Sequence, residues 1–176
     1  MTSLCHLSSP LGMLTLSAEG EAITGLWLEH QKYFGSTLPL QTQTEETPVL
    51  RQASLWLERY FSGKDDPGPL PPLAPQGSAF RQAVWALLQE IPYGQITTYG
   101  ALTRQLQSKG IAASPQAVGG AVGHNPISIL IPCHRVVGSG GSLTGYAGGI
   151  EKKRFLLELE GVDLSGLYTP TRGTAL

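Results

Sequence analysis

The segment from Leu7 to Leu28 alternates short apolar stretches with turn signals. The turns fall at residues 9–12 (SPLG) and 18–21 (AEGE). Short apolar runs separated by glycine, proline and acidic residues are typical of antiparallel strands. The pattern therefore predicts that the chain opens with a small antiparallel sheet.

A helical repeat of apolar positions follows. It begins after Thr47 and Pro48, which suit an N-cap and a first helical position, and it stops at Gly63. The apolar residues at helical spacing are Val49, Leu50, Ala53, Trp56, Leu57, Tyr60 and Phe61. This helix is expected to cover the sheet. Residues 64–77 then contain five prolines, which stiffen the chain and remove backbone donors. We expect this stretch to be the linker between two domains, residues 1–75, which end in the proline-rich stretch, and residues 76–176.

The second half of the chain has the pattern of short helices. Helices are predicted from Ser78 to about Pro92, from Thr97 or Thr98 through Leu106, from Ser114 to about Val122, and from Gly149 to Glu160. In the last of these, Phe155, Leu156 and Leu159 are expected to face inward, with Gly161 just past the end. The two middle helices suggest a helix-turn-helix, although many small helical pairs pack in the same way.

Composition and charge narrow the class of protein. Hydrophobic residues at 41% and charged residues at 14% indicate a folded chain. The formal net charge of −1 does not favour a nucleic-acid partner, but the two halves differ. Residues 1–75 carry four basic and eight acidic side chains, whereas residues 76–176 carry eight and five. Only the second half suits a polyanion, and chance scatter of a few charges explains the difference about equally well.

Cysteine and histidine usage argues against disulfides and metals. Cys5 and Cys133 are far apart and form no CxxC pair, and the four histidines lack metal-ligand spacing. We expect no metal and no cofactor. No apolar run approaches the roughly 18 residues of a membrane span, and the polar start of the chain has no basic region before an apolar stretch. A cytoplasmic protein that does not bind membranes is therefore expected.

The strongest chemical signal surrounds Cys133. An apolar run at residues 128–131 leads through Pro132 to Cys133, which His134 and Arg135 follow at once. Nearby positive charge or a helix N-terminus lowers the pKa of a cysteine thiol from about 8.5. Because neighbouring side chains diverge, His134 is expected to reach the thiol through a water molecule and to need an orienting carboxylate. A lone cysteine is more often an inert core residue, but this run favours a thiolate nucleophile. Cys5, in an alternating strand without basic neighbours, is expected to be a small core residue.

Two glycine-rich stretches follow the cysteine, at residues 138–142 (GSGGS) and 145–149 (GYAGG). Glycine lets the backbone approach a ligand closely, and Tyr146 could stack on a planar ring such as an unstacked base. A surface hairpin is the alternative interpretation.

Five blocks in order resemble the O6-alkylguanine-DNA alkyltransferases: residues 117–121 (AVGGA), 125–126 (NP), 131–136 (IPCHRV), 145–149 (GYAGG) and 157–161 (LELEG). The resemblance is close over residues 78–161 and looser in the first half. It implies an α/β fold class, with a small ribonuclease H-like α/β domain followed by a mostly α winged helix-turn-helix-like domain. Related proteins that bind lesions without repairing them lack the reactive cysteine, whereas Cys133 is present here.

The resemblance also implies an activity and the roles of five residues. The activity is irreversible, single-turnover transfer of the alkyl group of O6-alkylguanine in DNA to Cys133, with O4-alkylthymine left open as a second substrate. Glu160 would orient His134, which would deprotonate Cys133 through a water molecule. Asn125 would be a buried hinge between the helix-turn-helix and the active-site loop. Tyr99 would lie beside the flipped nucleotide and donate a hydrogen bond to the departing guanine.

The base pocket and the DNA surface follow from the same resemblance. The carbonyl of Val136, with that of Cys133, would read the exocyclic amine of guanine, Tyr146 would wall the pocket, and the Ala147 amide would bond to O6. The second helix would enter the minor groove of double-stranded DNA during base flipping. The predicted DNA-binding residues are Ser114, Gln116, Ala117, Gly119 and Arg135. A monomer is expected, with cooperative binding to DNA left open.

One position departs from the family pattern. Gln116 stands where the family usually has an arginine that fills the gap left by the flipped base. Glutamine can hydrogen-bond the orphaned partner base but brings no positive charge. Base extrusion is therefore expected to be less efficient, or to rely on Arg104 or Lys109.

Two other classes of protein compete with repair. In a winged-helix DNA-binding regulator or lesion sensor, Cys133 would be structural or would sense oxidation. A cysteine hydrolase needs an oxyanion site and a histidine that reaches the thiol directly, which the adjacency of Cys133 and His134 makes difficult.

Overall fold

The computed structural model describes residues 1–63 and 66–171, which form two compact units. The first unit takes in the described residues up to Gln76 together with residues 126–130. The second takes in residues 77–125 and the described residues from Ile131 onward. Residues 64–65 of the predicted linker lie outside the described residues. No helix of the described residues is both long and apolar enough to span a membrane.

The first unit is built on a four-stranded sheet in the order β3-β2-β1-β4. Its strands are β1 (Thr2–Ser9), β2 (Gly12–Glu19), β3 (Ala22–Leu28) and β4 (Thr42–Thr44). The antiparallel pairs β1–β2 and β2–β3 confirm the predicted hairpins. However, β4, which was not predicted, pairs with β1 in parallel, so the sheet is mixed. All three residues of β4 are polar and exposed, and they lack the apolar alternation that indicates a strand.

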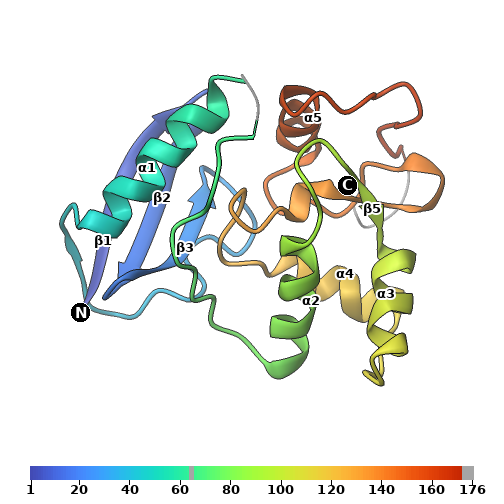
Figure 1. The fold of residues 1–176 in the computed structure, drawn as a ribbon, viewed down its shortest axis with the longest axis horizontal. Coiled ribbons are helices and arrows are strands. Elements are labelled where there is room, and N and C mark those ends of the chain that lie inside the picture. The colour runs from blue at the N-terminus through green and yellow to red at the C-terminus, as the bar shows by residue number, and fades with distance from the viewer. Residues whose placement is uncertain (64–65, 172–176) are drawn as a thin grey trace. The chain divides into compact units, whose positions relative to one another are not determined.

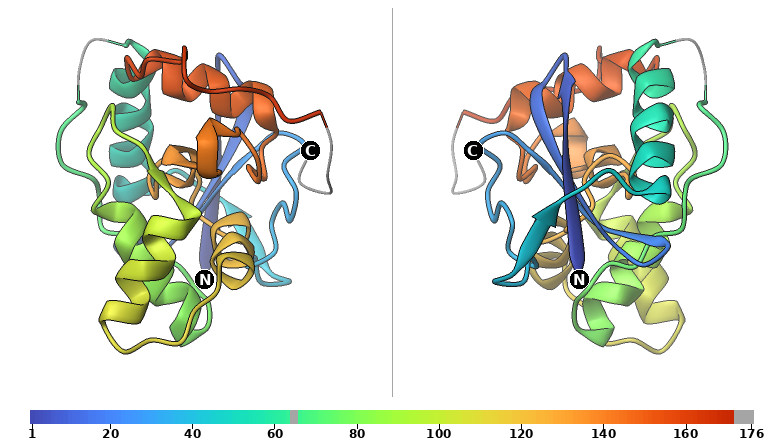
Figure 2. Two further views of the ribbon diagram at one scale, coloured as in Figure 1. Left: turned by 90° about the vertical axis from the view of Figure 1, so that its right-hand side faces the viewer. Right: turned by 90° about the vertical axis from the view of Figure 1, so that its left-hand side faces the viewer.

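One helix, α1 (Pro48–Phe61), covers a face of this sheet (Figures 1 and 2). It begins as predicted, because the Thr47 side chain accepts a hydrogen bond from the Leu50 backbone N–H and Pro48 occupies the first turn. Its buried face consists of Val49, Leu50, Ala53, Trp56, Leu57 and Tyr60. The amphipathic pattern thus predicted both the helix and the face that it buries.

Two segments outside the strands pair with β3. The Ile23 N–H donates to the Pro72 carbonyl at 2.8 Å, within the stretch predicted as a linker. Farther along β3, the Leu26 N–H donates to the Pro126 carbonyl at 2.8 Å, and the Leu26 carbonyl accepts from the Ser128 N–H at 3.0 Å. The segment that leads to Cys133 is therefore anchored on the sheet of the first unit.

The second unit is mostly helical. Its helices are α2 (Ala79–Gln89), α3 (Tyr99–Ser108), α4 (Pro115–Gly123) and α5 (Ile150–Leu159), with single 3-10 turns η1 (Cys133–Arg135) and η2 (Ser139–Gly141) and the short parallel pair β5 (Thr97–Thr98) and β6 (Val136–Val137). Ser78, Thr98 and Ser114 cap α2, α3 and α4 as predicted, each accepting from the backbone N–H three residues later. The three helices pack together, and α5 lies at the end of the unit opposite the α3–α4 loop (Figures 1 and 2).

The buried face of α5 differs from the prediction. Lys153, Leu156 and Leu157 are buried, whereas Phe155 and Leu159 are only half-buried. Positions 153, 156, 157 and 160 share one face of a helix, since residues three and four apart lie on the same side. The inward face of α5 therefore carries a lysine and leads to Glu160.

Candidate active site

Cys133 lies at the start of the 3-10 turn η1. Pro132 precedes it with a φ of −79°, and the turn closes with a hydrogen bond from the Val136 N–H to the Cys133 carbonyl. Only 4% of the Cys133 surface is exposed. The chain then enters β6, where Val136 pairs with Thr97 just before α3. This pairing brings Tyr99, the first residue of α3, to the same part of the second unit.

Burial controls the state of the thiol. It raises the pKa of Cys133, and the hydrogen bond from Asn125, the charge of Lys153 and the backbone N–H groups oppose it without overcoming it. The expectation of a lowered pKa is therefore wrong for the resting protein, because it counted the basic neighbours and left out desolvation. The resting thiol keeps its proton and needs a base.

His134 and Glu160, 26 residues apart in sequence, form a buried pair. His134 Nε2 and Glu160 Oε2 lie 2.5 Å apart, and neither side chain is exposed. Burial lowers the pKa of His134 more than the hydrogen bond and the charge of Glu160 raise it, so the ring is neutral. A neutral ring that donates from Nε2 to the carboxylate has its basic lone pair on Nδ1. The pair therefore provides an oriented base one residue from the thiol.

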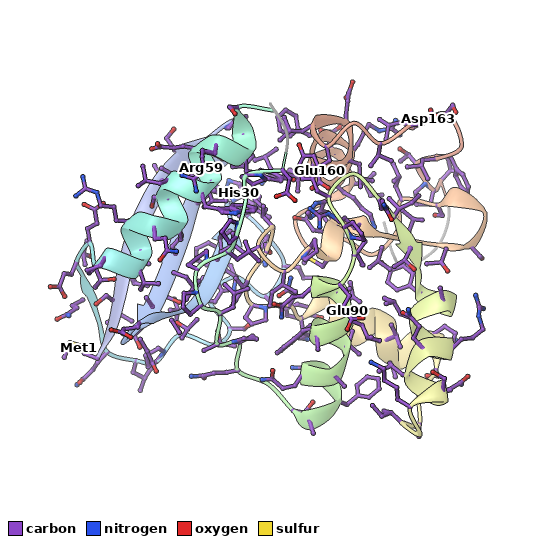
Figure 3. All side chains as sticks on the ribbon, in the orientation of Figure 1. Met1, His30, Arg59, Glu90, Glu160 and Asp163 are labelled. Carbon is purple, nitrogen blue, oxygen red and sulfur yellow. The ribbon has the colours of Figure 1, made fainter. Side chains whose placement is uncertain are left out.

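Two more donors hold the carboxylate of Glu160, which Figure 3 shows at the end of α5. Arg135 Nε donates to Oε1 at 2.7 Å and the Gly94 N–H donates to the same atom at 3.1 Å. Burial raises the pKa of Glu160, but His134 and then Arg135 outweigh burial and hold it far below its ordinary value. Gly94 has a φ of +78°, and a Cβ there would lie 3.0 Å from the Glu160 carbonyl. Glu160 thus stays ionised and orients His134 without taking its proton.

Arg135 points into the site. Only 8% of its surface is exposed, and one terminal nitrogen donates to the Ile91 carbonyl at 2.7 Å. Its guanidinium also lies over the Tyr93 ring, 5.8 Å from the centroid. These contacts and the bond to Glu160 give Arg135 an internal role. Its position does not favour the predicted contact with DNA.

Asn125 follows α4 and is 3% exposed. Its Nδ2 donates to the Ile131 carbonyl at 2.8 Å, and its side chain also hydrogen-bonds the Cys133 sulfur, which favours the thiolate. Asn125 therefore ties the end of α4 to the segment that carries Cys133.

Tyr99 and Tyr146 flank the thiol. The Tyr99 hydroxyl donates to the Thr144 carbonyl at 2.9 Å, and a Cβ on Gly145 would lie 2.5 Å from that hydroxyl, so the backbone at Gly145 approaches closely. Burial and then the charge of a Cys133 thiolate raise the pKa of both tyrosines, so both remain protonated donors. The Tyr146 hydroxyl is buried and finds no hydrogen-bond partner among the described residues.

Other predicted residues lie on α4 and in the glycine-rich loop. Ser114, Gln116 and Ala117 are exposed on the first turn of α4 or at its cap, and Gly119 is half-buried on the next turn. Ala147 is half-buried in the loop that follows Tyr146. Arg104 and Lys109 are exposed on and just after α3.

Lys153 is a site residue that the sequence interpretation missed. Its ammonium donates to the carbonyl of Val136 and, at 3.0 Å, to the carbonyl of Thr144. Its spacing from Leu156, Leu157 and Glu160 places it on the same helical face, which the sequence could have indicated. The Gly94 N–H and the Thr144 carbonyl are backbone groups, so no side-chain pattern in the sequence predicts them.

No cluster of three or more potential metal ligands occurs within residues 1–63 and 66–171. A hollow of about 650 Å³ on the outer side of α5 is separate from the thiol, and its lining residues are Ile150, Glu151, Arg154, Phe155, Glu158 and Thr169.

Two family models match the chain. Residues 5–71 match the ribonuclease-like domain of 6-O-methylguanine DNA methyltransferase, and residues 79–162 match the DNA-binding domain of the same family. The chain belongs to this family. Both family domains are therefore present, and they correspond to the mixed sheet with its helix and to the helical unit that carries Cys133.

Relatives of the family agree over most of the chain. A methylated-DNA–protein-cysteine methyltransferase of Haemophilus influenzae is 44% identical over 162 residues, 91% of this chain and 88% of the relative. A protein of the same name from Mycobacterium tuberculosis is 43% identical, over 88% of this chain and 89% of its own length. A crystal structure of M. tuberculosis OGT in complex with DNA superposes with a TM-score of 0.77 at 39% identity, over 90% of this chain and 92% of that one.

The family relationship establishes the activity. The chain is a DNA-repair methyltransferase that transfers an alkyl group from DNA to a protein cysteine. This confirms the interpretation of the motifs as those of a repair protein and excludes the two competing classes.

Proposed function

We propose that Cys133 is the acceptor and that it takes the alkyl group of an O6-alkylguanine flipped out of duplex DNA, once per chain. The buried arrangement of Cys133, His134 and Glu160 supports this assignment most strongly, because it provides a nucleophile, a neutral base and a fixed carboxylate. Cys5, on β1, hydrogen-bonds Ser54, and burial and the charge of Glu46 raise the pKa of its thiol.

The transfer would proceed as a displacement at the alkyl carbon. His134 Nδ1 takes the thiol proton through one water molecule, and the resulting imidazolium is stabilised by Glu160. The sulfur forms a bond to the alkyl carbon while the bond from that carbon to O6 breaks. The Tyr99 hydroxyl, which donates to the Thr144 carbonyl in the free protein, turns its proton to the departing guanine. The guanine leaves with the electron pair of the broken bond. The product is a thioether, which water does not hydrolyse, so the protein is consumed.

Backbone groups near the thiol would read the base. We expect the carbonyls of Cys133 and Val136 to accept from the exocyclic amine, the Ala147 amide to bond to O6, and Tyr146 to form a wall. The Val136 carbonyl already accepts from Lys153, and the Cys133 carbonyl accepts from the Val136 N–H. A carbonyl oxygen has two lone pairs, so each can still take the amine.

The first two turns of α4 would form the DNA surface. Ser114 and Ala117 have short exposed side chains and Gly119 has none, which allows the helix to lie close to a groove, and Gln116 is exposed on the first turn. Contacts made mainly to the backbone of the minor groove suit a lesion found in any sequence. Flipping moves the damaged base to the buried thiol. We expect the protein to act on double-stranded DNA as a monomer.

The number of lesions removed per chain tests this proposal. With O6-methylguanine duplex in several-fold excess, we expect a single burst of repair equal to the amount of active protein, followed by no further loss of lesion. The remaining O6-methylguanine can be counted by chromatography of the hydrolysed DNA. Continued turnover after the burst would contradict consumption of the acceptor.

Replacing Gln116 with arginine is expected to speed repair of duplex lesions. Flipping costs a few kcal/mol, and a guanidinium that can stack and attract phosphate recovers more of this cost than a neutral amide. We expect about a tenfold gain on duplex DNA, equivalent to about 1.4 kcal/mol, and a steeper dependence of binding on salt. Free O6-benzylguanine needs no flipping, so its reaction rate should not change.

The matched control is Gln105→Arg, which adds the same charge at an exposed position on α3. An equal gain in repair rate from both variants would show that the added positive charge, and not its place on α4, causes the gain. Equal gains on duplex and free base for Gln116→Arg would instead indicate an altered pocket.

A further inference from the structure

The chain after α5 folds back onto the loop that follows β6. Residues 162–168, the C-terminal segment, pair with this loop through two backbone hydrogen bonds. The Leu143 N–H donates to the Tyr168 carbonyl at 2.9 Å, and the Tyr168 N–H donates to the Gly141 carbonyl at 3.0 Å. Figure 1 shows the red chain beyond α5 beside this orange loop. Two stretches of the second unit that are far apart in sequence are therefore joined.

Apolar side chains support the pairing from inside. Leu143 is fully buried with Val137 and Leu157. The half-buried apolar side chains packed against this cluster are Ile150, Val162, Leu164 and Leu167. Three of these four belong to the C-terminal segment, and removing apolar surface from water favours the packed arrangement. The segment is therefore held on the loop by side chains as well as by the backbone.

The two backbones approach most closely at Gly141. Its φ is +93°, and a Cβ there would lie 2.0 Å from the carbonyl oxygen of Gly166. The preceding residue, Gly140, also has a positive φ, +74°, but a Cβ there meets nothing within 4 Å. A side chain at position 141 would therefore force the loop and the C-terminal segment apart, whereas one at position 140 would not.

The loop leads directly into a wall of the acceptor site. Leu143 is followed by Thr144, whose carbonyl accepts from the Tyr99 hydroxyl at 2.9 Å and from the Lys153 ammonium at 3.0 Å. A Cβ on Gly145 would lie 2.5 Å from the same hydroxyl, so the hydroxyl oxygen rests against this backbone. The placement of this backbone therefore sets where the Tyr99 hydroxyl lies before it turns its proton to the guanine.

The ionisation of Cys133 depends on other parts of the chain. Burial raises the pKa of the thiol, and Asn125, Lys153 and the backbone N–H groups of η1 oppose the rise. None of these groups belongs to residues 138–143 or to the C-terminal segment. Displacing the loop is therefore expected to change the help given to the leaving group and to leave the nucleophile as it is.

We propose that the C-terminal segment positions the Tyr99 hydroxyl for the departing guanine, because it holds residues 141–143 and thereby the Thr144 carbonyl in place. This inference rests on the proposed transfer of an alkyl group from guanine to Cys133. The segment acts through Thr144 and does not touch the reacting atoms, so its residues are positioning residues.

The first test places alanine at Gly141, with Gly140→Ala as the matched control. Both variants put a side chain at a positive φ in the same loop, but only Gly141→Ala meets the C-terminal segment. The rate of methyl transfer is measured at saturating O6-methylguanine duplex. We expect Gly141→Ala to slow transfer about tenfold, part of the roughly 10²–10⁴-fold that a positioned acid contributes. Gly140→Ala should keep the parent rate, and both should keep the parent's half-saturating concentration of DNA.

Iodoacetamide separates help to the leaving group from a loss of folding. It also alkylates the thiol by attack at carbon, but iodide leaves without a hydrogen bond from Tyr99. In a Cys5→Ser background, Cys133 is the remaining thiol. Gly141→Ala should then react at the parent rate across the pH range. A loosened protein would instead react faster, because only 4% of the Cys133 surface is exposed in the folded chain.

A double variant tests whether the effect passes through the hydroxyl. Tyr99→Phe removes that hydroxyl and should itself slow transfer from O6-methylguanine. Adding Gly141→Ala to Tyr99→Phe should then cause little further loss, because residues that act in one chain of contacts are not additive.

Two further measurements keep the inference testable if Gly141→Ala folds poorly. Leu167→Ala loosens the C-terminal segment without a backbone clash, and it should slow methyl transfer while leaving the reaction with iodoacetamide unchanged. In the parent chain, the amides of Leu143 and Tyr168 are bonded across the pairing, and we expect hydrogen exchange to show both protected and opening together.

Equal transfer rates in Gly141→Ala and Gly140→Ala would overturn the inference, as would additive losses in the double variant or a faster reaction of Gly141→Ala with iodoacetamide. An undiminished rate in Leu167→Ala or Tyr99→Phe, or unprotected Leu143 and Tyr168 amides in the folded parent, would do the same. The proposed function fails separately, if the parent protein carries no alkyl group on Cys133 after repair.

Discussion

Replacing Glu160 with glutamine is expected to slow alkyl transfer at neutral pH about 100-fold, at the lower end of what general acid–base catalysis contributes. The carboxylate fixes the His134 ring through a 2.5 Å contact and raises its basicity. A neutral amide cannot stabilise the imidazolium formed when the thiol proton leaves. The apparent pKa of Cys133 should therefore rise, which can be measured from the pH dependence of its reaction with free O6-benzylguanine.

The same substitution should also destabilise the second unit. Arg135 is buried and would lose its ionic partner, and leaving one half of a buried ion pair costs about 3–5 kcal/mol. The pKa of Glu160 is depressed in the folded protein, so its stabilisation is present above its ordinary value of 4.5 and is lost as pH falls toward the folded value. The difference in unfolding free energy between parent and Glu160→Gln should therefore shrink in acid, as urea titrations at several pH values would show.

Glu158→Gln is the matched control, because Glu158 lies on the same helix and is exposed. It should change neither the rate nor the stability measurably. If Glu160→Gln behaves like Glu158→Gln in the pH profile, then Glu160 is only a charge at a helix end and His134 is not oriented by it.

Replacing Cys133 with serine is expected to abolish transfer. A serine hydroxyl is far less acidic than a thiol, so a neutral histidine cannot provide a useful concentration of the anion. The change is nearly isosteric, so the folded structure should be retained. Repair of an O6-methylguanine duplex is measured beside the thermal midpoint, so that a loss of activity can be separated from a loss of folding.

The second cysteine of the chain provides the control. Cys5 lies half-buried on β1, and burial raises the pKa of its thiol while a hydrogen bond from Ser54 opposes the rise. Cys5→Ser should repair at the rate of the parent protein. Transfer that survives in Cys133→Ser and disappears in Cys5→Ser would reverse the assignment of the acceptor.

The sequence predicted those helices and strands whose formation depends on local residue patterns. Thr47, Ser78 and Ser114 marked helix starts because an N-cap needs a side-chain acceptor for backbone N–H groups within a few residues. The strand β4 was missed because three exposed polar residues carry no periodicity, and its pairing with β1 is a long-range contact. The pairing of Pro72 with β3 was missed for the same reason, since proline content alone indicates a linker.

In the candidate site, too, some features were predicted from the sequence and others were not. The sequence motifs identified Cys133, His134 and Glu160 as site residues, and all three are buried, with His134 bonded to Glu160. The resting state of the thiol depends on desolvation, which no sequence neighbour reveals, so the expected lowering of its pKa was wrong. The resemblance placed Arg135 among the DNA-binding residues, but its side chain is bonded to Glu160 at the end of α5.

The location of the transferred group tests the central claim most directly. The parent protein is incubated with excess O6-methylguanine duplex, digested, and its cysteine-containing peptides are analysed by mass spectrometry. We predict one methyl group per chain, carried entirely by the peptide that contains Cys133, with the Cys5 peptide unchanged. Methyl groups found on Cys5 or on another residue, or lesions repaired without a methyl group retained on Cys133, would contradict the account.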